Sequence, residues 1–327
     1  MAIDQKTIDE INKRFNGGKG DKLVRQLSGD PDEVDVIPTG SLNFDLITGI
    51  GGFPLGRVIE LYGPESSGKT TATIHAMVEA QRMGYNVAFV DFEQAFDKKY
   101  AISLGVDPDN LLIAQPDTTE DGLNAVVSIL ETGKFNLIVV DSTNAMSPKA
   151  EFEGDMEDSQ MGLNARLLNK GLRQITSRAK TQDCCVMFIS QIRHKIGVVY
   201  GSPEVVGVGN AMKFYCSMRF ELRKQSTVKN SEGRSVVNTV RFKNTKNKLA
   251  APFEEALLDI RFGEGFDREN EIIDIAKSMG IVTLAGSWYS YGDIKLGQGK
   301  EKARELLKDN EELYIELRNK VVEECKK

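Results

Sequence analysis

The stretch GPESSGKT, at Gly63–Thr70, constrains the fold of this 327-residue chain more than any other feature. It fits the pattern G-x-x-x-x-G-K-[ST], in which a glycine-rich loop surrounds phosphate oxygens with backbone amides. An apolar run, Val58–Tyr62, precedes the loop, and a helical pattern, Thr70–Arg82, follows it. The sequence therefore predicts a strand, a phosphate-binding loop and a helix in direct succession.

Strand and helix patterns continue to alternate after this segment. Short apolar runs predict strands at Asn86–Phe92, Leu137–Asp141 and Val186–Ser190. The segments between them predict helices at Glu120–Thr132 and Leu163–Lys180. Because strands that alternate with helices connect through right-handed crossovers, we expect a mostly parallel sheet. The predicted fold class is therefore α/β, with a P-loop NTPase core.

The remainder of the chain has a different pattern. Three segments between residues 213 and 265, beginning KFYCSMRF, SVVNTVRF and ALLDIRF, indicate consecutive antiparallel strands. Two helical stretches, Glu271–Met279 and Glu301–Lys326, flank a hairpin pattern at residues 287–297. Residues 5–15 predict a short amphipathic helix that a glycine-rich link follows. We therefore expect an N-terminal helical extension at 1–33, a core at 34–266 and a small C-terminal α/β domain at 267–327.

The phosphate-binding loop supplies most of the expected nucleotide contacts. Lys69 would reach the β- and γ-phosphates, and the hydroxyl of Thr70 would bind Mg²⁺. Asp141 ends an apolar strand, a place where a carboxylate commonly holds the magnesium of P-loop enzymes. We therefore predict that ATP and Mg²⁺ bind here, with Thr70 and Asp141 as the metal ligands. The loop residues expected to contact the nucleotide are Gly63, Pro64, Glu65, Ser66, Ser67, Gly68, Lys69, Thr70 and Thr71.

Hydrolysis also requires a group that polarises the attacking water. Glu93 stands at the C-terminal end of its predicted strand, the edge where α/β sheets bind ligands. Asp91 competes for this role, but alternation points both side chains to one face and Glu93 lies nearer the strand's end. Gln191 also follows a strand, directly before a long loop. Its amide could hydrogen-bond the γ-phosphate and report its presence to that loop.

The segment after Gln191 has no helical or strand period over about eighteen residues. Structureless loops of more than about 12–15 residues are uncommon inside compact domains and usually carry a function. The formal net charge of −6 argues mildly against a nucleic-acid ligand. A nucleic-acid partner would therefore need a locally basic surface.

Cysteine usage and hydropathy indicate the compartment. The chain has four cysteines, and Cys184 and Cys185 are adjacent in an apolar run, which favours reduced thiols over disulfides. No apolar stretch reaches the ~18 residues of a membrane span, and the first residues do not resemble a signal peptide. We expect a cytoplasmic protein without a membrane partner.

Several further segments together resemble one known family. GPESSGKTT, MGLNARLLNKGLRQI, QIRHKIGVVYGSPE, GNAMKFYCSMR, KNKLAAPF and WYSYGDIKLGQGK occur in the order found in bacterial and phage RecA recombinases. The resemblance covers nearly the whole chain. It implies a RecA-type, DNA-dependent ATPase that forms helical filaments on single-stranded DNA. Such a filament pairs its strand with homologous double-stranded DNA and promotes strand exchange in recombination, DNA repair and the SOS response.

The resemblance also assigns residues to the nucleotide site. It makes Glu93 the catalytic carboxylate, Gln191 the γ-phosphate sensor and Tyr100 the aromatic side chain that stacks on adenine. Lys246 and Lys248 match lysines that reach the triphosphate held by a neighbouring protomer. A positive charge supplied in this way would stabilise the transferring phosphoryl group.

Two loops, at about Glu153–Met161 and Ile192–Gly209, match the DNA-binding loops of the family. Single-strand binders follow the phosphate backbone with cations and place apolar or aromatic side chains against the bases. Arg166 and Arg173 lie two turns apart on one face of a predicted helix and suit the first of these roles. The expected DNA contacts are Met161, Arg166, Arg173, Arg193, Lys195, Ile196, Val199, Tyr200, Gly209 and Asn210.

The resemblance implies partners as well. Residues 1–33 would dock on the adjacent protomer as an oligomerisation segment, and Phe214 is a second interface candidate. A LexA-type repressor and loading proteins are further possible partners. Two departures from the family pattern stand out. VVGVGN, at residues 205–210, lacks the usual threonines and glycine pair, which we expect to change the loop's affinity or ordering. The sequence also ends without an acidic tail, so we expect easier loading on duplex DNA.

Two other interpretations stay open at this point. One is a different ATPase on the same core, such as a hexameric helicase motor or a small-molecule kinase, neither of which would need QIRHKIGVVYGSPE. The other is a non-catalytic filament or regulatory protein that binds ATP as a structural ligand. The intact set of Lys69, Thr70, Glu93 and Asp141 argues against that second interpretation.

Overall fold

The computed structural model describes residues 4–16, 24, 34–154, 162–194, 204–207 and 210–325. The chain divides into two units, Met1–Val34 and Asp35–Lys327. In the first unit, helix α1 runs from Gln5 to Asn16, as the amphipathic pattern predicts. Its Ile8 is buried, and the side chain of Asn12 exchanges two hydrogen bonds with the backbone of Val24.

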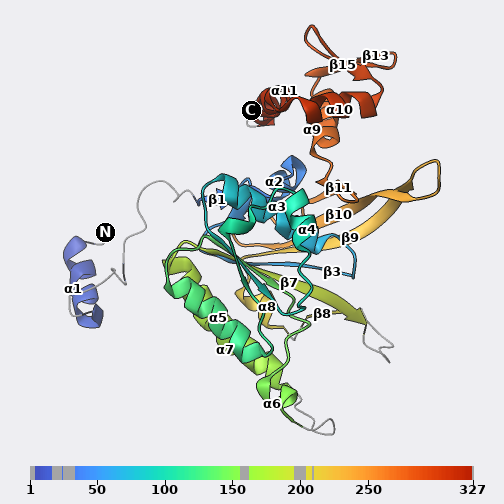
Figure 1. The fold of residues 1–327 in the computed structure, drawn as a ribbon. Coiled ribbons are helices and arrows are strands. Elements are labelled where there is room, and N and C mark those ends of the chain that lie inside the picture. Colours follow the sequence, from blue (N-terminus) through green and yellow to red (C-terminus); the bar gives the residue numbers. More distant parts are fainter. Residues whose placement is uncertain are drawn as a thin grey trace. The chain divides into compact units, whose positions relative to one another are not determined.

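A mixed sheet of ten strands forms the centre of the second unit (Figure 1). Six neighbouring strands are parallel, and in sheet order they are β9 (Met218–Lys229), β3 (Val58–Gly63), β7 (Cys185–His194), β6 (Leu137–Asp141), β4 (Val87–Asp91) and β5 (Leu111–Ala114). Beyond β9 the sheet continues through three antiparallel strands, β10 (Ser235–Asn247), β11 (Glu255–Arg261) and β12 (Gly265–Phe266). This arrangement confirms the mostly parallel sheet and the antiparallel strands after it that the sequence predicts.

Helices cover both faces of the sheet (Figure 1). One face packs against α2 (Leu42–Thr48) and α3 (Lys69–Arg82), and the other against α5 (Thr119–Glu131) and α7 (Leu163–Thr181). Successive strand residues alternate between the two cores, because side chains along a strand point to opposite faces. Shorter elements connect these layers: β1 (Val36–Ile37), β2 (Phe53–Pro54), α4 (Lys98–Ser103), the 3₁₀ turn Pro108–Asn110, α6 (Lys149–Phe152) and α8 (Ala211–Tyr215).

The predicted loop after Gln191 is partly a strand, which corrects the sequence-based prediction. β7 continues through Gln191 to His194 instead of ending at Ser190. Its extension pairs in antiparallel fashion with β8 (Glu204–Val206), so that Ile192 faces Val206. The polar residues Gln191 and Arg193 interrupt the apolar run that marks the buried part of β7. Pairing between two distant segments, which a local pattern does not reveal, makes this part a strand.

The C-terminal region contains α9 (Arg268–Ser278), a three-stranded sheet and two further helices. The sheet consists of β13 (Val282–Ala285), β14 (Trp288–Tyr291) and β15 (Ile294–Gln298), so the predicted hairpin is present with one added strand. The single helix predicted over Glu301–Lys326 is wrong. The structure has α10 (Lys300–Asp309) and α11 (Glu311–Cys325). They separate at Asn310, whose side chain accepts a hydrogen bond from the amide of Leu313 and thereby caps the second helix. None of the described helices combines the length and apolar character that a membrane crossing requires.

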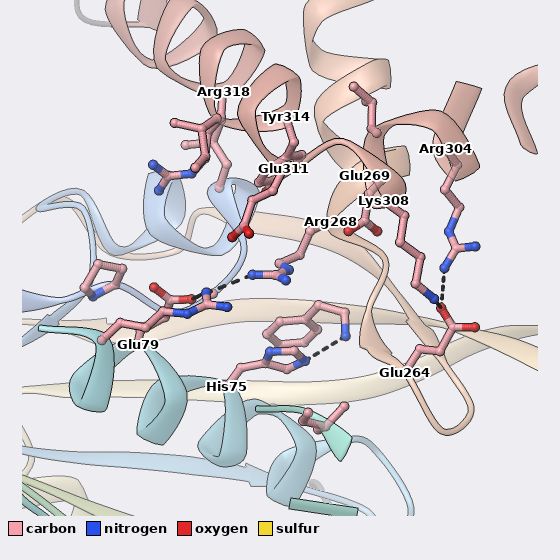
Figure 2. Close-up of a pocket in the computed structure, with 18 of the residues that line it drawn as sticks. His75, Glu79, Glu264, Arg268, Glu269, Arg304, Lys308, Glu311, Tyr314 and Arg318 are labelled. Carbon is pink, nitrogen blue, oxygen red and sulfur yellow. Dashed lines mark hydrogen bonds and ion pairs between the residues drawn. The ribbon is translucent and has the colours of Figure 1, made fainter. Parts of the chain in front are cut away.

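His75 joins the helix of the phosphate-binding loop to the start of the C-terminal region (Figure 2). Its ring stacks on Phe266 at 4.3 Å, and its Nε2 accepts a hydrogen bond of 2.8 Å from the Phe266 amide. Gly265 has φ +79°, and a Cβ there would lie 2.2 Å from this Nε2. Burial, reinforced by nearby Arg268 and Arg82, lowers the pKa of His75 to about 3. The imidazole is therefore neutral at physiological pH, as an acceptor must be.

We expect His75→Phe to remove this acceptor while keeping the stacked ring. The folded pKa of His75 lies below its ordinary value of 6.5, so its stabilising contribution is present above pH 6.5 and decreases as the pH falls towards 3. The difference in free energy of unfolding between the wild type and His75→Phe should therefore shrink by about 2 kcal/mol between pH 7 and pH 5. Urea unfolding at both pH values measures it. A difference that is the same at both pH values would contradict the neutral-imidazole assignment.

Ion pairs surround this junction and line a cavity of about 550 Å³ between α3 and the C-terminal helices. Arg268 lies 3.8 Å from Glu79 on α3, and Lys308 lies 2.7 Å from Glu264, which also pairs with Arg304 (Figure 2). The carboxylate of Glu271 on α9 accepts hydrogen bonds from Ser41 and from the first amides of α2. These contacts tie the C-terminal region to the central sheet and its helices within the second unit.

Candidate nucleotide-binding site

The phosphate-binding loop lies between the end of β3 and the start of α3, where the sequence predicts it. Gly63 has no room for a side chain, because a Cβ would lie 2.1 Å from the carbonyl oxygen of Leu222. Gly68 has φ +85°, and its Cβ would lie 2.4 Å from Ile260. No side chain caps the amino end of α3 at Gly68. Its first amides can therefore bind an anion, with the helix dipole in support.

Lys69 places a positive charge inside this loop. The side chain is buried, and its Nζ donates hydrogen bonds to the carbonyl oxygens of Pro64 at 2.6 Å and Gly63 at 3.3 Å. Burial lowers the pKa of Lys69, while the carboxylates of Asp141, Glu93 and Glu65 raise it. An anionic ligand would stabilise the ammonium group in the same way as these carboxylates.

Thr70 and Asp141 form a pair that fits a magnesium ion. The Thr70 Oγ1 donates a hydrogen bond of 3.1 Å to Asp141 Oδ2. Burial and the nearby Glu93 raise the pKa of Asp141 to about 7. A cation beside this carboxylate would stabilise its charged form. Within the described residues no three His, Cys, Asp or Glu side chains converge as a metal site. A hard cation held by Thr70 and Asp141 would therefore take its other ligands from phosphate oxygens and water, as Mg²⁺ commonly does.

Side chains from β7 and from the segment after β6 converge on Glu93, which follows β4. Its Oε1 accepts a hydrogen bond of 2.6 Å from Ser142 Oγ, after β6, and one of 3.0 Å from Gln191 Nε2, on β7. The competing Asp91 is buried, and its Oδ2 is occupied by the amide of Phe96 and the side chain of Gln115. Glu93, by contrast, is exposed, so its carboxylate is accessible to water.

A cavity of about 350 Å³ continues from the loop to Tyr100. The Tyr100 hydroxyl lies 3.1 Å from Thr71 Oγ1, and Asp97 accepts a hydrogen bond from the Tyr100 amide at the start of α4. Residues of β10, of the end of β11 and of the turn after it also line this cavity. The sequence did not single out these residues, because they come from a part of the chain far beyond the loop. They are Arg261, Phe262 and Gly263, with Asn238, Val240 and Ile260 beside them.

Lys246 and Lys248 lie elsewhere on the same chain. Lys246 on β10 pairs with Arg219 on β9, and Arg219 pairs with Glu60 in the first half of β3. The phosphate-binding loop follows the other end of β3. Lys246 Nζ hydrogen-bonds the carbonyl oxygens of Lys213 and Phe214, and Lys248 Nζ lies 3.4 Å from the latter. The structure therefore does not bring these two lysines to the phosphate-binding loop of their own chain.

The described DNA-contact candidates lie on α7, on the end of β7 and before α8. Arg166 and Arg173 are exposed on α7, and neither forms an ion pair within the described part of the chain. Arg193 is exposed on the extension of β7, and Asn210 precedes α8. Six further candidates fall outside the described residues: Met161, Lys195, Ile196, Val199, Tyr200 and Gly209.

Comparison with known proteins assigns the chain to a family. Residues 2–267 match the model of the RecA N-terminal domain, and residues 270–326 match the model of the RecA C-terminal domain. The chain belongs to the RecA family. It is 47% identical to Protein RecA of Bacteroides thetaiotaomicron over 325 residues, which cover 99% of this chain and 97% of that protein. It is 48% identical to Protein RecA of Geobacter sulfurreducens over 317 residues, covering 96% and 92% of the two chains.

A solved structure agrees with this assignment at the level of fold. The crystal structure of the RadB recombinase aligns with 70% of this chain and 98% of its own, with a TM-score of 0.54 and 21% identity. Membership of the RecA family makes the chain a nucleotide-binding, DNA-dependent ATPase of recombination and DNA repair, which binds DNA and forms oligomers. The helicase, kinase and non-catalytic interpretations of the sequence are therefore set aside.

Proposed function

We propose that this RecA-family ATPase hydrolyses ATP at a boundary between two copies of the chain and thereby controls its affinity for single-stranded DNA. The hydrogen bond between Glu93 and Gln191 carries the proposal. It joins the carboxylate that would activate water to the strand that leads into the second DNA-binding loop. A change at the γ-phosphate would therefore reach both the hydrolytic group and the DNA-binding loop.

Each residue of the site has a defined part in this reaction. The backbone amides at the start of α3 and the Lys69 ammonium would bind the phosphate oxygens. Thr70 and Asp141 would hold Mg²⁺, which when bound neutralises charge on the β- and γ-phosphate oxygens. Glu93 would orient the attacking water and accept its proton. Tyr100 would stack on the adenine ring within the adjoining cavity.

Gln191 would act as the γ-phosphate sensor. Its side chain donates to Glu93, and the same amide could donate to a phosphate oxygen in exchange. Triphosphate binding would then move Gln191 and free Glu93 for water. Because coupling between two ligands is reciprocal, single-stranded DNA should in turn tighten ATP binding.

Lys246 and Lys248 would complete the site of a neighbouring protomer. Within their own chain they lie towards the other end of β3 from the phosphate-binding loop, and Phe214 beside them is 72% exposed. A large exposed aromatic side chain is typical of an interface residue. We therefore place Phe214 and both lysines on the surface that faces the next protomer's triphosphate. Residues 1–33 would dock on a neighbouring protomer as the second part of the filament interface.

Arg166, Arg173 and Arg193 would contact the phosphates of the single strand, with the loop residues 153–161 and 192–209 against the bases. The resulting filament would sample homologous duplex DNA by base pairing and exchange strands with it. A LexA-type repressor and loading proteins stay predictions of the family resemblance. The buried, free thiols of Cys184, Cys185 and Cys216 support a cytoplasmic location, because such thiols persist in a reducing compartment.

Mixing two inactive variants tests the shared site. Glu93→Gln inactivates the side of the site that holds the triphosphate, and Lys246→Ala/Lys248→Ala inactivates the facing side. In an equimolar mixed filament, about one boundary in four would combine an intact Glu93 with intact lysines, so hydrolysis should return to about a quarter of the wild-type rate. Phosphate release in saturating single-stranded DNA measures it.

The matched control mixes Glu93→Gln with Lys69→Ala, two changes on the same side of the site. This mixture should stay inactive, because no boundary contains a complete set. If the first mixture is as inactive as the control, the lysines serve their own chain and the shared site is refuted.

A further inference from the structure

Hydrogen bonds between β7 and the segment after β6 continue beyond the last backbone pair of these two strands. The last ladder pair joins Val140 to Phe188, and β7 then continues for six residues beyond it. The segment after β6 follows this extension with contacts of its own. The Thr143 amide donates a hydrogen bond of 2.9 Å to the carbonyl of Ile189, and its hydroxyl lies 2.9 Å from that of Ser190.

At the next position, the side chain of Asn144 makes the hydrogen bonds that a neighbouring strand would make. The Oδ1 of Asn144 accepts a hydrogen bond of 2.7 Å from the backbone amide of Gln191. The Nδ2 of the same side chain donates one of 3.3 Å to the backbone carbonyl of Gln191. A carboxamide offers one acceptor and one donor side by side, as a peptide group does. Asn144 therefore pairs with Gln191 as a neighbouring strand would.

The Gln191 carbonyl accepts a second hydrogen bond beside that from Asn144. The amide of Gly207 donates a hydrogen bond of 3.1 Å to the Gln191 carbonyl, next to the pairing of Ile192 with Val206. Gly207 packs closely against the segment after β6, since a Cβ there would lie 2.9 Å from Thr143 Oγ1. The main chain of Gln191 is thus held by both Asn144 and Gly207, while its side chain reaches Glu93.

We propose that Asn144 is a positioning residue that couples the Gln191 side chain to the β7–β8 pair. The proposal rests on the assignment of Gln191 as γ-phosphate sensor. If the backbone of Gln191 were loosely held, a movement of its side chain would stay local. Because hydrogen bonds hold this backbone in place, the movement is transmitted along β7. Asn144 provides this clamp on the β6 side, so a change at the triphosphate reaches Arg193 and the second DNA loop. Asn144 itself contacts neither nucleotide nor DNA in this scheme.

The test compares the affinity for a fluorescein-labelled oligothymidylate in two nucleotide states, with ADP and with a non-hydrolysable ATP analogue. The ratio of the two dissociation constants, from fluorescence anisotropy, reports coupling. We expect Asn144→Ala to lower this ratio about tenfold, in the range of ordinary coupling energies. Asn144→Asp keeps the acceptor for the Gln191 amide and loses only the donor, so its ratio should lie between those of the wild type and Asn144→Ala. Helix content by circular dichroism verifies that each variant is folded.

Gln191→Ala, measured in parallel, separates this inference from the proposed function. If Gln191→Ala keeps the wild-type ratio, Gln191 is not the sensor and the proposed function fails at that point. If Gln191→Ala brings the ratio of the two dissociation constants to about one, while both Asn144 variants keep the wild-type ratio, only the role of Asn144 is overturned. A purely structural role of Asn144 would weaken DNA binding equally in both nucleotide states, and this unchanged ratio would also overturn the inference.

Discussion

Glu93→Gln should lower the rate constant of ATP hydrolysis in saturating single-stranded DNA by about 10²–10⁴-fold, the usual contribution of general base catalysis. The amide preserves the size of the side chain and can still contact Ser142 and Gln191, but it cannot take a proton from water. Nucleotide binding should persist, because Lys69 and the loop amides are intact. Single-turnover phosphate release measures the chemical step, and titration with a fluorescent ADP analogue measures binding.

Asp91→Asn provides the matched control at the same strand end. Asp91 is buried and accepts hydrogen bonds from the Phe96 amide and Gln115, so its replacement should lower stability more than it lowers the chemical step. A reduction of less than tenfold for Glu93→Gln, together with a larger loss for a folded Asp91→Asn, would reverse the two assignments.

Arg219→Met should destabilise the core by about 3–5 kcal/mol, because it leaves a buried carboxylate without its cation. Glu60 on β3 is 0% exposed, and its Oε2 accepts a hydrogen bond of 2.5 Å from Arg219 Nε on β9. Its Oε1 has no hydrogen-bond partner within the described part of the chain. The guanidinium also lies 4.5 Å from the ring of Tyr62, directly before the phosphate-binding loop. Urea unfolding, monitored by circular dichroism, measures the loss.

Two further variants separate the lost ion pair from lost packing. Glu60→Gln/Arg219→Met removes the buried charge along with its partner and should regain part of the lost stability. Arg223→Met removes an arginine from the same strand that is partly exposed and paired with Glu204 and Glu221, and it should change stability by about 1 kcal/mol or less. Equal losses for Arg219→Met and the double variant would show that packing, not the unpaired carboxylate, causes the effect.

The sequence predicts the central part of this molecule well for a physical reason. Strands buried on both faces are short apolar runs, and the ends of β3, β4 and β6 lie within one residue of their predicted positions. The loop glycines are fixed by backbone geometry, so their spacing is visible in the sequence. Glu93 and Asp141 follow from the rule that parallel strands gather functional groups at their carboxyl ends.

Contacts between distant segments are the part that the sequence does not reveal. The pairing of Ile192 with Val206 joins two segments that are separated in the sequence, and nothing local marks it. Asn144 is an ordinary polar residue after a strand until its two bonds to Gln191 are seen. The roles of Lys246 and Lys248 came from family resemblance alone, because a second protomer is required to give them a target.

Phosphate release from ATP, measured without DNA and with saturating single-stranded oligonucleotide, tests the coupling between nucleotide and DNA most directly. We predict that the oligonucleotide strongly accelerates release, that Gln191→Ala abolishes the acceleration, and that electron micrographs show filaments on the DNA. Equal rates with and without oligonucleotide, in a preparation that forms no filaments on it, would contradict the proposal that triphosphate at a shared boundary organises the DNA-binding loops.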